Sequence, residues 1–208
     1  MTRAFEELFA IPDAFTGIEV PGRTDAWILS DALAAHGISS DDPRVDKYCD
    51  IYFPHLEREL AAPPSGKRYG VMPGVRPLLD VLARRGDVYL ALLTGNYEQA
   101  ARMKLEHFDL WKYFACGAFG DAAPNRNGLL PKALARVAEC AGLNVTPADT
   151  VIVGDTPLDV GVAIANGARS IGVATGSHTA DQLRASGADV VFDDLSDTGR
   201  VLQALIRT

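Results

Sequence analysis

The sequence predicts an α/β fold in which a parallel sheet is flanked by helices and preceded by a helical segment. From residue 70 onward, short apolar runs alternate with stretches of helical periodicity, which is the order typical of parallel sheets. Residues 1–68 carry only helical patterns, and Pro63-Pro64-Ser65-Gly66 marks a linker near their end. We therefore expect two domains, a helical one over 1–68 and an α/β core over 69–208.

The helical domain is expected to contain three helices. The first includes residues 5–9, and the second runs over 25–36, where a glycine follows as a stop signal. The third covers residues 46–60, and Pro54 is expected to bend or end it because proline cannot donate the helical hydrogen bond.

The core elements follow in order. Strands are expected at short apolar runs bounded by turn residues, at 88–93, 151–153, 170–174 and 189–192. Helices are expected where apolar residues recur at helical spacing, at 75–83, 98–106, 131–141, 158–166, 179–186 and 198–206. Parallel sheets bind ligands beyond the C-terminal ends of their strands. The polar residues that follow 88–93 and 151–153 are therefore the candidates for chemistry.

Composition narrows the class of protein. The net charge is −7 and the lysines and arginines are scattered, which argues against a nucleic-acid-binding surface. No apolar stretch has the roughly 18 residues needed to cross a membrane, and the N-terminus lacks a signal-peptide pattern. Cys49, Cys116 and Cys140 are widely spaced, so we expect free thiols and a cytoplasmic protein.

Two carboxylates follow the apolar run at 151–153. Asp155 and Asp159 straddle a strand-to-helix turn, in which Gly154 lets the backbone pass closely. Carboxylates that converge beyond a strand are suitable ligands for Mg²⁺. The alternative is that Asp155 merely caps the helix that begins near Pro157.

Thr94-Gly95-Asn96 ends the most apolar run of the chain. A hydroxyl group and free backbone N–H groups at the start of a helix form an anion site. The alternative is an ordinary turn, because these residue types are common in turns. The pairing of this strand end with the acidic one after 151–153, in the same parallel sheet, favours the anion site.

The order of these features resembles motifs two to four of the haloacid dehalogenase superfamily: a strand with Thr94-Gly95-Asn96, a basic residue, then a strand with Gly154-Asp155. The chain is similar to the phosphoglycolate-phosphatase-like branch along nearly its whole length. The resemblance implies a Rossmann-like core with an N-terminal helical cap. It also implies a Mg²⁺-dependent phosphatase that acts on small phosphorylated metabolites through an aspartyl-phosphate, with a metal site and a threonine that favour phosphate over halide.

The resemblance also implies roles for the core residues. Thr94 would hydrogen-bond the transferred phosphoryl group, with Gly95 and Asn96 beside it. Asp155 would bind the metal, and Asp159 would hold the metal or its water.

The basic residue of motif three is less clearly marked, because the usual Lys-Pro pair is absent. We favour Arg126, whose planar fork suits phosphate and carboxylate together; Lys132 is the alternative, or else a solvated helix residue. In the cap, Arg23 is a candidate contact for a substrate carboxylate or a second phosphate, or else a surface arginine.

The superfamily's first motif, a strand that ends in Asp-x-Asp-x-Thr and supplies the nucleophile, does not occur in these 208 residues. The run 190–198 begins similarly, but its acidic spacing differs, and we expect it to form the last strand and the cap of the closing helix. The resemblance places the absent strand centrally, between those that end at Thr94 and Asp155. We therefore expect an N-terminally truncated, inactive form of a phosphatase. The alternative is a non-catalytic protein that binds phosphate and metal; a monomer and a homodimer are both compatible with the sequence.

Overall fold

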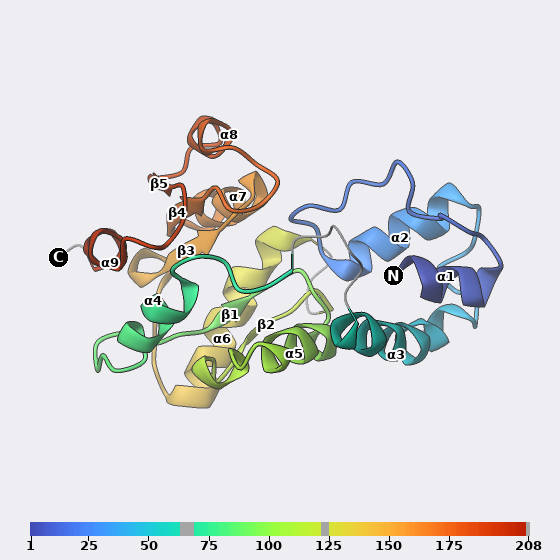
Figure 1. The fold of residues 1–208 in the computed structure, drawn as a ribbon, viewed down its shortest axis with the longest axis horizontal. Coiled ribbons are helices and arrows are strands. Elements are labelled where there is room, and N and C mark those ends of the chain that lie inside the picture. The colour runs from blue at the N-terminus through green and yellow to red at the C-terminus, as the bar shows by residue number, and fades with distance from the viewer. Residues whose placement is uncertain (63–68, 122–124, 207–208) are drawn as a thin grey trace.

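The structure is a computed structural model that describes residues 1–62, 69–121 and 125–206 (Figure 1). Its first part contains α1 (Thr2–Phe9), α2 (Asp25–Ala35), a 3-10 turn (Val45–Lys47) and α3 (Tyr48–Ala61). α3 does not end at Pro54, because its packing against α1 and α5 outweighs the one missing backbone hydrogen bond. The predicted linker at 63–66 lies outside the described residues, so the division into two domains stays a prediction.

The strands are all parallel, as the sequence predicts. They are β1 (Leu92–Leu93), β2 (Gly117–Ala118), β3 (Val151–Gly154), β4 (Arg169–Val173) and β5 (Val190–Phe192). They form two sheets, β1-β2 and β3-β4-β5, in register Leu92 with Gly117, Val151 with Arg169 and Ile171 with Val190. Among the described residues, β1 and β3 are therefore edge strands.

Helices cover both faces of the strands. They are α4 (Val75–Leu82), α5 (Glu98–His107), α6 (Leu129–Ala141), α7 (Pro157–Asn166), α8 (Ala180–Ala185) and α9 (Thr198–Leu205). One apolar cluster joins α4 and α9 to β4 and β5, and another joins α6 and α7 to Leu93 of β1 and Ile152 of β3. The two sheets are thus held by shared helices, and the predicted α/β architecture is confirmed.

The strand predicted at 88–93 is shorter than expected. Only Leu92–Leu93 forms a ladder, and every residue from 88 to 93 is half-buried and none is fully buried. β1 pairs on one side with β2, a two-residue strand that the apolar pattern does not reveal. An isolated strand edge cannot sustain the longer ladder, because its backbone groups have no partner in the described chain.

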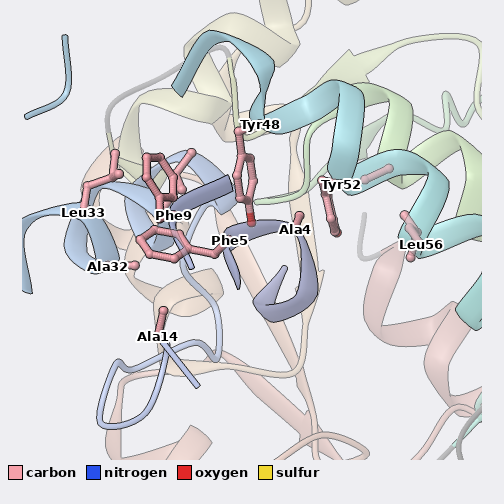
Figure 2. Close-up of a cluster of buried hydrophobic side chains, with 11 residues drawn as sticks. Ala4, Phe5, Phe9, Ala14, Ala32, Leu33, Tyr48, Tyr52 and Leu56 are labelled. Atoms are coloured by element: carbon pink, nitrogen blue, oxygen red, sulfur yellow. The ribbon is translucent and has the colours of Figure 1, made fainter. Parts of the chain in front are cut away.

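The N-terminal helices have their own apolar core, which Figure 2 shows in close-up. Phe5 and Tyr48 are fully buried in it, and the Phe5 ring lies 4.6 Å from that of Phe9. Ala100 of α5 belongs to the same cluster, so the N-terminal helices pack directly on the core helix that follows Thr94. None of the helices in the described ranges is both long and apolar enough to span a bilayer.

Candidate active site

The loops at the C-terminal ends of β1 and β3 meet the N-terminal segment around a cavity of about 260 Å³. Its lining includes predicted core site residues from three different parts of the chain: Thr94 with Gly95 and Asn96, Arg126, and Asp155. The N-terminal side of the cavity is lined by residues of the segment 20–28, including Arg23 and Asp25. Parallel strands bring their carboxyl ends to one edge, which explains why residues far apart in sequence converge here.

The turn after β1 is shaped by its own hydrogen bonds. The Thr94 backbone N–H donates to Ala118 O at 3.1 Å, which continues the β1-β2 ladder. The Thr94 hydroxyl accepts a hydrogen bond from the Asn96 backbone N–H at 3.2 Å. Gly95 is buried, and a side chain there would lie 2.2 Å from Arg23 O, so the N-terminal segment reaches this turn only because residue 95 is glycine.

Arg126 lies on a 3-10 turn (Arg126–Gly128) and reaches across to the loop after β3. Its Nη2 donates to Asp159 Oδ1 at 2.5 Å, and its Nη1 donates to Gly22 O at 2.8 Å. Its Nε is buried and has no hydrogen-bond partner among the described residues. A buried, unpaired donor beside a cavity is the kind of group that a bound oxygen ligand would satisfy.

Asp155 and Asp159 have different surroundings. Thr156, not Asp155, is the N-cap of α7, and Asp159 Oδ2 accepts hydrogen bonds from the Thr156 backbone N–H and hydroxyl. Because its other oxygen pairs with Arg126, the buried Asp159 carboxylate is fully engaged. Asp155 is left exposed at the cavity, so the view that it merely caps the helix is wrong.

Neighbouring groups shift the pKa of Asp155 in opposite directions. Although the Asp155 side chain is exposed at the cavity, the surrounding protein removes part of its hydration and raises its pKa, and repulsion from Asp159 raises it further. Arg126 and His178 act in the opposite direction. A carboxylate that is costly to ionise gains from a nearby cation, which fits a role in metal binding.

The fit of Mg²⁺ is partial. In the parts of the chain that the structure describes, no three Asp, Glu, His or Cys side chains gather as a metal cluster. Asp155 offers a free carboxylate, whereas both oxygens of Asp159 are engaged with Arg126 and Thr156. Protein-bound Mg²⁺ is held by one or two carboxylates plus phosphate oxygens and water. Asp155 therefore fits as one ligand, and the metal role of Asp159 stays a prediction.

Of the two remaining predicted residues, Arg23 reaches the cavity and Lys132 does not. Arg23 lines the cavity, but its guanidinium pairs with Asp31 and Glu19 and lies 4.3 Å from the Trp27 ring. Lys132 is exposed on α6 and lines a different cavity of about 420 Å³. Of the two basic candidates for motif three, the structure thus brings Arg126 and not Lys132 to Thr94.

Sequence reasoning missed some residues that shape the site. Asp25 and Lys104 both hydrogen-bond Asn96, and the sequence offers no reason to assign either residue to the site. Thr156 was detectable, because Thr-x-x-Asp at a helix start is a capping-box pattern. The run 190–198 behaves as expected: it holds β5, and Asp197 caps α9 by accepting from the Arg200 N–H at 3.0 Å.

Comparison with known proteins gives consistent results. A family model described as HAD-hydrolase-like matches residues 126–198. The phosphoglycolate phosphatase of Rhodospirillum rubrum is 30% identical over 86% of this chain and 71% of its own. "Probable phosphatase IndB" of Dickeya dadantii is 36% identical over 66% of this chain and 58% of its own, so the match spans less than two thirds of that relative.

Solved structures agree on the fold. The crystal structure of CbbY from Rhodobacter sphaeroides in complex with phosphate superposes with a TM-score of 0.61 at 22% identity. The superposed region covers 95% of this chain and 88% of the CbbY chain. At this identity, the likeness establishes the fold alone.

Proposed function

This chain belongs to the haloacid dehalogenase superfamily, in its phosphoglycolate-phosphatase-like branch, and we propose that it forms the cap and phosphate-binding part of a phosphatase for small phosphorylated metabolites. The observation that carries the proposal is the convergence of Thr94, Arg126 and Asp155 on one cavity at the strand ends. A hydroxyl group, a guanidinium and a carboxylate are the groups needed to bind a phosphoryl group and a cation beside it.

Each residue has a stated part in this proposal. The oxygen of the Thr94 hydroxyl group already accepts a hydrogen bond from the Asn96 N–H, and the hydroxyl group itself donates a hydrogen bond to a phosphoryl oxygen. Arg126 neutralises phosphoryl charge, and its ion pair with Asp159 fixes its position. Asp155 would hold Mg²⁺ together with phosphate oxygens, and the ion, when bound, would stabilise negative charge on the phosphoryl group.

The attacking carboxylate is proposed to belong to a segment outside these 208 residues. Asp25 and Asp159 are engaged in hydrogen bonds, and Asp155 is assigned to the cation. A strand placed between β1 and β3 would pair with both edges and would end beside Thr94 and Asp155. Its aspartate would form the aspartyl-phosphate, and a cytoplasmic location fits such metabolite chemistry.

The test is hydrolysis of p-nitrophenyl phosphate with and without Mg²⁺, by this chain and by one extended upstream to the next in-frame start. We expect turnover only from the extended form with Mg²⁺, and its loss on Arg126→Met. Arg136→Met is the matched control, because Arg136 is exposed and pairs with Glu139 at the surface. Turnover that survives Arg126→Met would contradict the assignment.

A second candidate function is phosphate binding without catalysis. It is favoured by the lack of Asp-x-Asp-x-Thr in these residues while the strand-end groups are retained. If neither form hydrolyses p-nitrophenyl phosphate but both bind inorganic phosphate, this function replaces the first.

A further inference from the structure

A polar array joins the start of α2 to the turn after β1 and to α5. Asp25 Oδ2 accepts a hydrogen bond from the Tyr97 backbone N–H at 2.9 Å, and Oδ1 accepts from Asn96 Nδ2 at 3.3 Å. On the other side of the same amide, Lys104 Nζ donates to Asn96 Oδ1 at 2.9 Å. Asn96 therefore bridges a carboxylate and an ammonium group.

The chemistry of the three groups fixes this arrangement. A carboxylate only accepts hydrogen bonds and an ammonium group only donates them, so the Asn96 amide has one favourable orientation between them. Asp25 is 4% exposed, and burial raises its pKa while Lys104 opposes the shift. Burial likewise lowers the pKa of Lys104, and Asp25 opposes that shift. Each charge thus offsets part of the cost of burying the other.

The array leads directly to the proposed phosphate-binding hydroxyl. The Asn96 backbone N–H donates to Thr94 Oγ1 at 3.2 Å, which directs the hydroxyl proton away from this contact. The Asp25 backbone N–H donates to Gly95 O at 2.7 Å, so the cap holds the turn through main chain and side chain together. Asp25, Thr94 and Asn96 all line the cavity of about 260 Å³.

We propose that Asp25 and Lys104 are positioning residues: they fix Asn96 and, through it, the Thr94 hydroxyl, so that phosphate affinity depends on the contact between α2 and the turn. This inference rests on the proposed function, because it takes phosphate as the ligand of the cavity. Energetic coupling between phosphate binding and formation of the Asp25 contact acts equally in both directions. Bound phosphate therefore tightens the Asp25 contact, and loss of that contact weakens phosphate binding.

The first experiment measures binding of inorganic phosphate to the 208-residue chain by calorimetry. Asp25→Asn and Lys104→Met should each weaken binding by about tenfold, the loss typical of a charge-assisted hydrogen bond. The double variant should lose less than the product of the single losses, since both residues act through Asn96. Asp50→Asn and Lys47→Met, which make the same changes at exposed cap positions, should bind as the wild type does. A purely structural role would change stability and leave the dissociation constant unaltered.

The second experiment measures hydrogen exchange at the Tyr97 amide, and its wild-type arm needs no variant to be stable. Saturating phosphate should slow this exchange in the wild type, and Asp25→Asn should speed it and abolish the phosphate effect. Wild-type phosphate affinity in both variants, or a Tyr97 amide indifferent to phosphate that the wild type binds, would overturn the inference. If the wild type binds no phosphate, the proposed function fails instead. The array is then judged by exchange alone: faster exchange in Asp25→Asn supports it, and unchanged exchange overturns it.

Discussion

Replacing Arg126 with methionine should destabilise the chain by about 3–5 kcal/mol, the cost of leaving a buried charge without its partner. The Arg126 Nη2 donates to Asp159 Oδ1 at 2.5 Å, and the two side chains are only 11% and 7% exposed. Methionine has a similar length but offers no cation to the Asp159 carboxylate. With a typical slope of about 1–3 kcal/mol per molar urea, the unfolding midpoint should fall by at least about 1 M.

Two further variants separate this effect from general damage. Arg136→Met removes an arginine whose pair with Glu139 is 57% and 63% exposed, so stability should change by no more than about 0.5 kcal/mol. Adding Asp159→Asn to Arg126→Met removes the uncompensated charge, while its amide oxygen still accepts a hydrogen bond from Thr156. Part of the stability should return. The reasoning is refuted if Arg126→Met is as stable as Arg136→Met, or if Asp159→Asn lowers stability further.

Three other outcomes follow from the same geometry. Thr156→Ala should cost about 1 kcal/mol in thermal unfolding, because it removes the N-cap of α7; an unchanged melting temperature would be inconsistent with the cap. Thr94→Val keeps the shape but loses the hydroxyl, so inorganic phosphate should bind about three- to tenfold more weakly in calorimetry, and equal binding would exclude Thr94 from the site. Burial raises the pKa of Asp25 above its ordinary 3.8, so its contribution to stability is complete below pH 3.8 and is lost as pH rises through the folded value. The urea midpoint of the wild type should therefore fall over that interval relative to Asp25→Asn, and a constant difference would contradict the shift.

The sequence predicts most of the elements because their signals are local. The helix at 25–36 and the strand at 151–153 are found within one or two residues of their predicted bounds. The run at 88–93 fails as a long strand because ladder length depends on partners, and β1 has one partner strand in the described chain. β2 escapes prediction for the same reason, since Gly117 and Ala118 carry no strand pattern of their own.

The site residues also differ in whether local sequence signals could reveal them. Thr94 and Asp155 stand directly after predicted strands, so the topology alone places both at one edge. The contact between Asp25 and Asn96 joins residues 71 positions apart, and a single sequence holds no sign of it. The choice of Arg126 over Lys132 likewise depends on where the 3-10 turn Arg126–Gly128 lies relative to the strand ends, which periodicity does not encode.

The two polar contacts at the cavity explain how the site is held although the sheet is divided. Arg126 with Asp159, and Asp25 with Lys104 through Asn96, each join segments that no shared ladder connects. Buried charges contribute little net stability but have a strong directional requirement. At the same time Val153 of the edge strand β3 is 42% exposed, so apolar surface is left uncovered on that strand. A strand between β1 and β3 would bury such surface at roughly 25 cal/mol per Å² while the charged contacts set the geometry. The charged contacts would then define the phosphate site, and the added strand would supply the stability to hold it.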